Sequence, residues 1–264
     1  MNNTVQVGKG GGFFSCCSCR LDAIVDYINT YKTYPDNVDS SKQFNPYKIG
    51  VPKNQDITFV YFEHYNNINT KLLPIPIIYN QSYQWHEYKN LNFEKLSPIV
   101  EKYFTPSTEI KKIKSNIETK YAIDYTNICV LFYRGNDKGR EIILCGYDVL
   151  ISKAKEVLKT NPNILFLIQS DETEFIEAVQ KEFPNNSFYF KDEIRHMSKS
   201  RKTVDLVFRD ENVKFSKYFL AITLIMSQCK YVICASGNCD IWITLFRKNC
   251  DNVFQCKGGK VIQG

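Results

Sequence analysis

The second half of this 264-residue chain alternates apolar runs with amphipathic segments, and this alternation constrains the fold more than any other feature. Uninterrupted apolar runs, such as the one at 129–133, are typical of strands that are buried on both faces. The segments between them carry apolar residues at three- and four-residue steps, as one side of a helix does. Alternating strands and helices predict an α/β fold, in which a parallel sheet is covered by helices on both faces. The predicted strands are 127–133, 164–169, 187–190, 231–235 and 252–256, and the predicted helices are 147–160, 172–183, 214–228 and 240–247.

The first half of the chain has a weaker pattern. It predicts a short strand at 4–7, then the glycine-rich segment 8–12, and then an amphipathic helix at 13–34, which Pro35 would end. The apolar stretch DITFVYF predicts another strand at 56–62.

Two further helices are predicted before the regular alternation begins. Ser97 is a suitable N-cap, and Pro98 would then occupy the first helical position, where proline fits. Beyond Pro106, apolar residues at helical spacing predict the next helix. We place a domain boundary in this Lys-rich region, so that the chain divides into residues 1–115 and 116–264.

The charge balance favours an anionic ligand but not a nucleic acid. The formal net charge is +6, and the Lys and Arg residues are spread along the chain rather than clustered. Because there is no basic run and no aromatic–basic motif, no nucleic-acid partner is expected. No apolar stretch reaches the roughly 18 residues of a membrane-spanning helix, so membrane insertion is not expected either. The first residues lack the apolar core of a signal peptide, and we therefore expect a cytoplasmic protein.

The ten cysteines are expected to be mostly thiols, because a cytoplasmic chain of this length does not need a disulfide framework. Cys16, Cys17 and Cys19 form a cluster near the N-terminus. A zinc site would need a fourth nearby ligand and the usual two-residue spacer, and this cluster has neither. The three histidines are scattered and no Asp-x-Asp triplet occurs, so we expect no metal site and no cofactor.

Polar residues follow three of the predicted strands. Because the carboxyl ends of parallel strands meet at one edge of a sheet, where open α/β sheets bind ligands, these residues should face one crevice. An arginine there would neutralise phosphate, a carboxylate would accept hydrogen bonds from ribose or base, and a turn that opens a helix would offer backbone N–H groups. In the plainer alternatives, Asp171 only caps the following helix and Asn238 is an ordinary turn residue. The pattern predicts nucleotide binding by Arg134, Gly135 and Asn136 after the first strand, Asp171 after the second, and Ser236, Gly237 and Asn238 after the third.

The glycine-rich segment near the N-terminus is a second candidate for phosphate binding. Gly10, Gly11 and Gly12 directly precede the amphipathic helix that begins at Phe13, and a helix N-terminus attracts anions. The segment GKGGG matches neither the P-loop nor the dinucleotide-binding fingerprint. The alternative is a flexible loop without a binding role.

Four motifs, in the correct order, resemble the α1,6-fucosyltransferase and protein O-fucosyltransferase superfamily. They are VLFYRGNDKGRE, FLIQSDETEFIEAVQKEF, LIMSQCKYVICASGN and, at the amino end, GKGGGFFSCCSCRLDAIVDYIN. The resemblance implies a GT-B-like fold of two Rossmann-like lobes, with the donor site on the C-terminal parallel sheet. It also implies a metal-independent, inverting transfer of fucose from GDP-fucose to a hydroxyl group of a glycan or a protein.

The resemblance further implies roles for individual residues. Arg134 matches the arginine that binds the β-phosphate of the donor, and residues 236–238 match the donor-phosphate loop. Lys138 and Glu141 match, across a one-residue gap, a lysine and a glutamate of the catalytic centre. In chemical terms, Glu141 would remove the proton of the acceptor hydroxyl while Arg134 neutralises the leaving phosphate.

Two departures from the family pattern leave alternatives open. The donor-binding histidine of the family is Phe132 in this chain, and its guanine-reading aspartate is Ile222. The alternatives are a transferase that uses another nucleotide sugar, a nucleotide-sugar-binding module without turnover, and an unrelated Rossmann-type enzyme such as a methyltransferase. The glycine motif before an acidic strand end that the last class would show is absent. The Asn-, Lys-, Ile- and Tyr-rich composition also resembles that of small glycosyltransferases from large DNA viruses.

Overall fold

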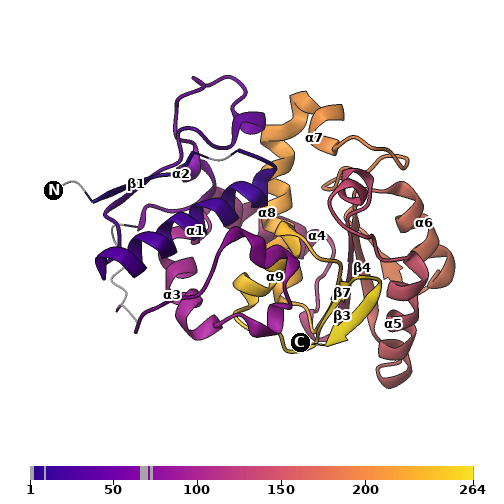
Figure 1. The fold of residues 1–264 in the computed structure, drawn as a ribbon. Helices are drawn as coiled ribbons and strands as arrows, with labels where there is room; N and C mark the ends of the chain where they lie inside the picture. The colour runs from indigo at the N-terminus through magenta and orange to yellow at the C-terminus, as the bar shows by residue number, and fades with distance from the viewer. Residues whose placement is uncertain (1–2, 9, 66–70, 72–73, 264) are drawn as a thin grey trace.

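A six-stranded sheet forms the centre of the C-terminal half (Figure 1), with the strand order β5-β4-β3-β6-β7-β8. The strands from β5 to β7 run parallel to their neighbours, and β8 is antiparallel to β7. The computed structural model describes residues 3–8, 10–65, 71 and 74–263. The strands are β3 (Ile128–Tyr133), β4 (Leu165–Ser170), β5 (Ser187–Phe188), β6 (Tyr231–Cys234), β7 (Val253–Lys257) and β8 (Lys260–Gln263).

The strand order places a topological switch point at the middle of the sheet. The chain runs outward from β3 through β4 to β5, and then returns to the other side of β3 with β6 and β7. In an open α/β sheet, ligands bind beside the carboxyl ends of the two strands where this reversal occurs. Every residue of β3 is buried, which agrees with its uninterrupted apolar sequence.

Helices cover both faces of this sheet, as the alternating sequence pattern predicts. Helices α5 (Tyr147–Thr160) and α6 (Thr173–Glu182) pack together on one face, and α8 (Asn212–Gln228) and α9 (Asn238–Arg247) lie on the other (Figure 1). Helix α8 is apolar on nearly all sides because it also packs against α4 (Thr108–Lys120).

The N-terminal half contains a smaller α/β unit. Strands β1 (Thr4–Gln6) and β2 (Asn37–Asp39) form a two-stranded parallel sheet, and the long helix α1 (Phe13–Tyr31) connects them. Helix α1 ends at Tyr31, before Pro35 is reached, and its C-cap residue Lys32 adopts a left-handed conformation with φ of 61°. The remaining helices are α2 (Thr58–Tyr61), α3 (Phe93–Phe104) and α7 (Val204–Val207), with the short 3-10 helices η1 (Asn45–Tyr47), η3 (Gln81–Trp85), η4 (Tyr88–Asn90), η5 (Tyr125–Asn127), η6 (Asn136–Arg140) and η7 (Arg209–Glu211).

Two sequence predictions in this half are wrong. The stretch predicted as a strand at 56–62 contains helix α2, because the Asp56 carboxylate accepts hydrogen bonds from the backbone N–H groups of Thr58 and Ser40 and so starts a turn. Helix α3 begins at Phe93 rather than near Pro98, because Asn92 is its N-cap and accepts from the backbone of Lys95.

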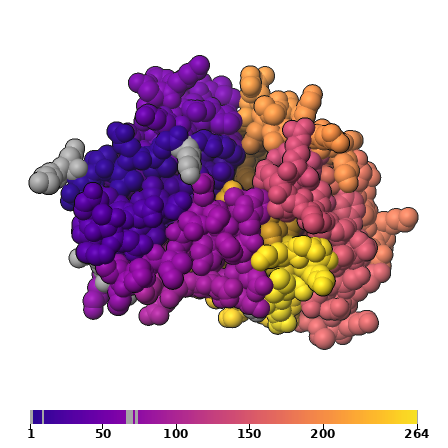
Figure 2. All heavy atoms as spheres, in the orientation of Figure 1, coloured from indigo at the N-terminus to yellow at the C-terminus, as the bar shows by residue number. Residues whose placement is uncertain are grey.

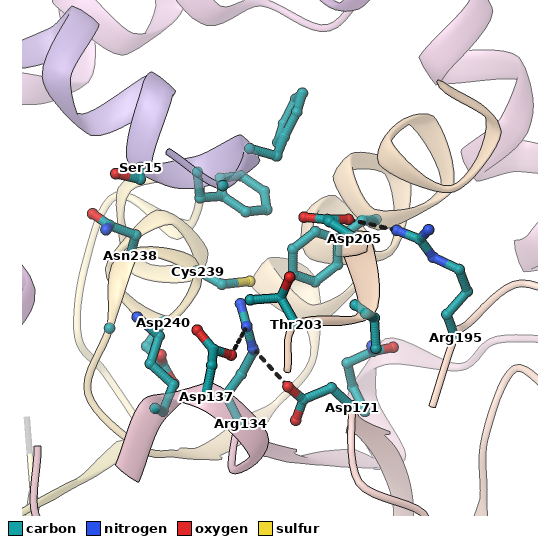
Figure 3. A pocket seen from close by; sticks show the side chains of 18 of the residues that line it. Ser15, Arg134, Asp137, Asp171, Arg195, Thr203, Asp205, Asn238, Cys239 and Asp240 are labelled. Atoms are coloured by element: carbon teal, nitrogen blue, oxygen red, sulfur yellow. Dashed lines mark hydrogen bonds and ion pairs between the residues drawn. The ribbon is translucent and has the colours of Figure 1, made fainter. Parts of the chain in front are cut away.

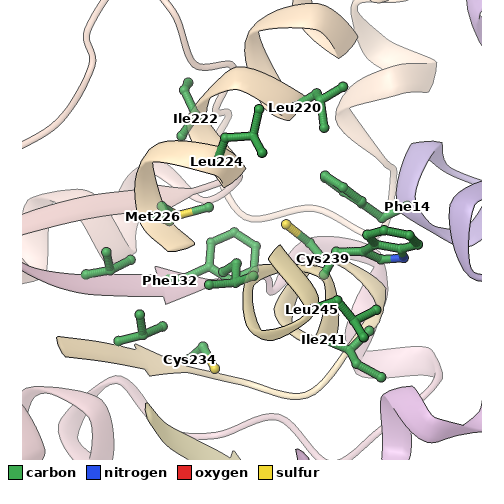
Figure 4. Packing of buried hydrophobic residues seen from close by; sticks show 14 of the residues in the cluster. Phe14, Phe132, Leu220, Ile222, Leu224, Met226, Cys234, Cys239, Ile241 and Leu245 are labelled. Carbon is green, nitrogen blue, oxygen red and sulfur yellow. The ribbon is translucent and has the colours of Figure 1, made fainter. Parts of the chain in front are cut away.

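The N-terminal and C-terminal halves share one hydrophobic core. The buried indole of Trp242 in α9 packs on the rings of Phe14 in α1 and Phe104 in α3, and its N–H donates to the hydroxyl of Ser18 at 3.0 Å. Figure 4 shows Phe14 beside helices α8 and α9. The domain boundary between residues 115 and 116 stays a prediction, and it falls inside α4.

Most of the cysteines are thiols, as the sequence predicts, and one pair forms a disulfide. Cys145, in the loop before α5, forms a disulfide with Cys256 of β7, with their Cα atoms 6.3 Å apart. The two residues are separated by 111 positions, so their pairing depends on the tertiary fold and leaves no local sequence signal. Cys16, Cys17 and Cys19 are thiols buried in α1. Within the described ranges, no cluster of residues suits a metal ion, and no helix combines the length and apolar character that crossing a membrane requires.

Candidate functional site

A cavity of about 300 Å³ lies at the carboxyl edge of the sheet, between the ends of β3, β4 and β6 and the amino end of α1. Figure 2 shows the corresponding hollow between the indigo N-terminal segment and the orange segment that contains α7. The cavity therefore occupies the switch point of the sheet. The sequence-predicted residues that line it are Gly11, Gly12, Phe13, Arg134, Lys138, Glu141, Asp171, Ser236, Gly237 and Asn238, whereas Gly10, Gly135 and Asn136 are not part of its wall.

The guanidinium group of Arg134 is held at the cavity wall by two carboxylates (Figure 3). Its Nε donates to Asp171 at 3.2 Å, and its Nη2 donates to Asp137 at 3.1 Å. Burial opposes the positive charge, but the two carboxylates outweigh this effect and raise the pKa of Arg134, so the group stays charged. The remaining nitrogen, Nη1, has no hydrogen-bond partner among the described residues, and it is the nitrogen with which a phosphate oxygen could pair.

Asp171 holds the loop after β3 in place by hydrogen bonds and does not cap a helix. Its carboxylate accepts from the backbone N–H of Gly135 as well as from Arg134, and its carbonyl oxygen accepts from the side chain of Asn136 at 2.7 Å. Helix α6 has Glu172 as its N-cap residue, without a side-chain cap. Gly135 and Asn136 thus hold Asp171, the partner of Arg134, in place without lining the cavity themselves.

Lys138, in η6, and Glu141, the residue that follows η6, form an ion pair in the cavity wall. The Nζ of Lys138 is 2.6 Å from a carboxylate oxygen of Glu141. The Glu141 side chain is 42% exposed and the Lys138 side chain 13% exposed, so the lysine is the more enclosed partner. Because an ion pair of this kind orients a carboxylate, the geometry suits Glu141 as a proton acceptor positioned by Lys138.

The turn at residues 236–238 is held by hydrogen bonds to Tyr88 and Gln255, which the sequence did not indicate as site residues. The Tyr88 hydroxyl accepts from the backbone N–H of Gly237 at 2.9 Å and donates to its carbonyl oxygen at 3.2 Å. Ser236 donates to the carbonyl of Cys256 and accepts from Gln255. The backbone N–H of Gly237, which was expected to bind an anion, therefore already donates to Tyr88. The backbone N–H groups that could still face an anion in the cavity are those of the first turn of α9.

A second tyrosine, Tyr47, lines the cavity beside the amino end of α1. The backbone N–H of Phe13 donates to the Tyr47 hydroxyl at 2.8 Å, and this hydroxyl donates to Asp205 at 2.8 Å. Asp205 in turn pairs with Arg195 at 2.7 Å (Figure 3). Burial, reinforced by the neighbouring Asp205 carboxylate, raises the pKa of Tyr47 well above its ordinary value, so its hydroxyl keeps its proton. Tyr47, Arg195 and Asp205 lie in short, aperiodic segments, which is why the sequence did not single them out.

Part of the cavity lining is apolar. Phe132, from the end of β3, and Ile222, from α8, are both buried (Figure 4), and both line the cavity. These are the two positions at which the sequence departs from the pattern that it resembles, and the structure brings both to the cavity.

Carboxylates outnumber cations around the cavity. The three cationic side chains in its wall are Arg134, Lys138 and Arg195. The acidic side chains in its wall are Asp137, Glu141, Asp171, Glu193, Asp205 and Asp240. Asp240, in the first turn of α9, was not predicted to be a site residue, and it is almost fully buried, with an exposed fraction of 2%. Burial raises the pKa of its carboxyl group to about 7.

No protein-family model matches the sequence, and no curated protein matches it either. The structure does resemble solved structures. It is similar to the crystal structure of NodZ alpha-1,6-fucosyltransferase soaked with GDP-fucose, with a TM-score of 0.57, 10% sequence identity and coverage of 100% of both chains. The structure of NodZ co-crystallized with GDP gives a TM-score of 0.55 and 11% identity, over 100% of this chain and 99% of the other. NodZ from Bradyrhizobium, in its selenomethionine form, gives 0.55 and 10% over the same shares.

At these sequence identities, the likeness establishes the fold and not the activity. The predicted fold class is confirmed: the chain has an α/β architecture with a mainly parallel sheet that matches the GT-B fold of the fucosyltransferase NodZ.

Proposed function

We propose that this chain is a glycosyltransferase that moves fucose from GDP-fucose to a hydroxyl group of a glycan or a protein, with inversion and without a metal ion. The observation that carries the proposal is the convergence of the loops after β3, β4 and β6 and the amino end of α1 on one cavity at the switch point. The fold of NodZ, whose structures were obtained with GDP-fucose and with GDP, supports the same class of reaction.

The proposed chemistry uses side chains that lie in the cavity wall. Arg134 would stabilise the negative charge that develops on the leaving diphosphate, since its guanidinium is fixed before the ligand arrives. Glu141 would accept the proton of the acceptor hydroxyl, and Lys138 would orient it. No cofactor is part of this scheme, and the two partners are the nucleotide-sugar donor and the glycan or protein acceptor. A cytoplasmic location and a viral source stay predictions.

One observation favours a donor other than GDP-fucose. Phe132 and Ile222 are apolar side chains of the cavity lining, so neither can form the hydrogen bonds that would read a guanine or hold a phosphate. A second observation favours binding without turnover: Arg134 is already bonded to two carboxylates, which reduces the charge that it can offer to a leaving group.

A ligand screen followed by a turnover assay separates these functions. Melting temperatures would be measured with GDP, UDP, ADP and their sugar conjugates, because a ligand at a hundred times its dissociation constant adds about 2.7 kcal/mol to the free energy of unfolding. Stabilisation by GDP and GDP-fucose, followed by hydrolysis or transfer of fucose, is the expected result. Stabilisation by another nucleotide would reassign the donor, and binding without any hydrolysis or transfer would indicate a binding module. If no nucleotide stabilises the protein, the proposed function is wrong.

A further inference from the structure

Asp240 differs from every other acidic side chain in the cavity wall. It is the third residue of α9, its exposed fraction is 2%, and its Oδ1 atom is buried without a hydrogen-bond partner among the described residues. A buried carboxylate oxygen without a donor is costly as long as the group is ionised. The position of Asp240 is therefore more easily occupied by a neutral acid than by an anion.

The pairing of the other charges leaves no cation for Asp240. In the described parts of the chain, each of the other carboxylates of the cavity wall has an ion-pair partner, and Asp240 has none. The pairs are Arg134 with Asp137 and Asp171, Lys138 with Glu141, Arg195 with Asp205, and Lys120 with Glu193. The ionised form of Asp240 would thus be a surplus negative charge at the place where an anionic ligand is proposed to bind.

The surroundings of Asp240 explain its tendency to hold a proton. Burial raises the pKa of its carboxyl group from 3.8 to about 7, although its own backbone N–H, the charges of Arg134 and Lys138, and the backbone N–H of Ala235 act in the opposite direction. An anionic ligand would raise this pKa further, because a second negative charge disfavours ionisation. The other titratable groups that act on Asp240 or are affected by it, from η4, β6 and α9, are Tyr88, Cys234 and Cys239.

We propose that Asp240 is a ligand-linked proton site: binding of a nucleotide sugar in the cavity takes up one proton from solvent, which Asp240 holds as a neutral acid. The O–H bond forms on the carboxylate of Asp240, and the buffer supplies the proton. The neutral acid removes the negative charge of Asp240 and provides a hydrogen-bond donor at the first turn of α9. This inference rests on the proposed function only in assuming that the ligand of the cavity is anionic.

The test is the pH dependence of donor binding by the full chain, measured by isothermal titration calorimetry with GDP-fucose and, if it does not bind, with UDP-glucose. The phosphates of these sugars do not titrate near neutral pH, so a change in affinity reports on the protein. Between pH 6 and pH 8.5 the wild-type affinity should fall by roughly tenfold or more, because Asp240 must regain its proton at the higher pH. At pH 8, titrations in buffers of different ionisation enthalpy should show uptake of about one proton.

Asp240→Asn should remove both effects, since the amide is neutral at every pH and keeps the shape of the side chain. At pH 6 the variant should bind about as well as the wild type, and at pH 8.5 it should bind better. Asp251→Asn, which changes an exposed aspartate beyond the other end of α9, is the matched control and should behave as the wild type. If Asp240→Asn does not fold, the wild-type pH profile and proton count still decide the question.

A wild-type affinity that does not depend on pH, or binding without proton uptake, would overturn the inference while leaving the proposed function intact. A pH profile that Asp240→Asn shares with the wild type would also overturn it. The absence of binding by both nucleotide sugars would count against the inference and against the proposed function together, and this result is recognised by the lack of any binding heat.

Discussion

The guanidinium of Arg134 lies between the carboxylates of Asp137 and Asp171, and this sharing determines what the arginine can do. The two bonds fix its orientation, so an incoming phosphate meets a donor that needs no rearrangement. The same bonds make Arg134 part of the local structure, because Asp171 is only 5% exposed and needs a cation nearby.

Replacement of Arg134 by alanine should therefore affect both binding and stability. We expect donor affinity to fall at least tenfold, since removing a charged hydrogen-bond partner of a phosphate costs roughly 1.5–3 kcal/mol. The melting temperature should fall as well, because Asp171 becomes a buried charge without its partner. In the double variant Arg134→Ala/Asp171→Asn, stability should recover while affinity does not. Unchanged donor affinity in a folded Arg134→Ala variant would move the phosphate site to the amino end of α1.

Glu141 is the candidate proton acceptor, and its replacement by glutamine tests that role. The variant should keep its donor affinity and lose single-turnover transfer by about a hundred- to ten-thousandfold, the usual effect of removing a general base. The matched control is Glu156→Gln, because Glu156 forms an ion pair with Lys153 at the same three-residue spacing, on the surface of α5. Equal transfer rates in Glu141→Gln and wild type would leave Glu141 without a catalytic role.

At the level of elements, Arg134 lies in the short connection between β3 and η6, residues 134–135. This connection passes so close to the start of α6 that there is no room for a side chain at Gly135, where a Cβ atom would overlap the carboxylate of Glu172. Glu172 is fully buried and accepts a hydrogen bond from the Tyr147 hydroxyl, so it cannot move aside easily. The glycine in the RGND motif is thus required by packing between two elements rather than by contact with a ligand.

Gly135→Ala should consequently destabilise the protein by roughly 1–3 kcal/mol, the usual cost of overpacking, and should weaken donor binding by displacing Arg134. Chemical denaturation and calorimetric titration would measure the two effects. Gly139→Ala is the control in the same loop, because a Cβ atom there would lie 3.4 Å from the nearest atom, in the side chain of Leu144, which is an ordinary contact. Equal stability of the two variants would show that the loop can shift without cost.

At the level of the whole molecule, the two halves of the chain meet around the cavity. They are joined behind it by the shared hydrophobic core and at its wall by the hydrogen bonds of Tyr47 and Tyr88. Each tyrosine lies in the N-terminal half and contacts a polar group of the C-terminal half. The shape of the cavity thus depends on contacts between segments that are far apart in sequence.

Tyr47→Phe should weaken this connection. The substitution removes the donor to Asp205 and leaves the buried N–H of Phe13 without an acceptor, which costs about 1–3 kcal/mol of stability. Donor affinity should fall too, because the amino end of α1 forms part of the cavity wall. Tyr231→Phe is the control, since among the described residues the Tyr231 hydroxyl makes only a 3.4 Å contact with Asn161, outside the cavity wall. A Tyr47→Phe variant as stable as this control would contradict the expectation.

The fold of the C-terminal half and most of its strand-end residues could be predicted from the sequence. Their signals are local: an apolar run marks a strand such as β3, and a parallel sheet then places Arg134, Asp171 and the turn after β6 at one edge. Because the side-chain period differs between strands and helices, this part of the fold is encoded in short segments that can be read one at a time.

The rest depended on contacts between distant residues, which no local pattern records. The stretch at 56–62 has a strand-like composition, but Asp56 and the surrounding packing turn it into α2. The Cys145–Cys256 disulfide and the hydrogen bond between Tyr88 and Gly237 each join residues separated by more than a hundred positions. Asp240 appears in the sequence as an ordinary aspartate at a helix start, and only burial beside the cavity, without a cation of its own, makes it a group that retains a proton near neutral pH.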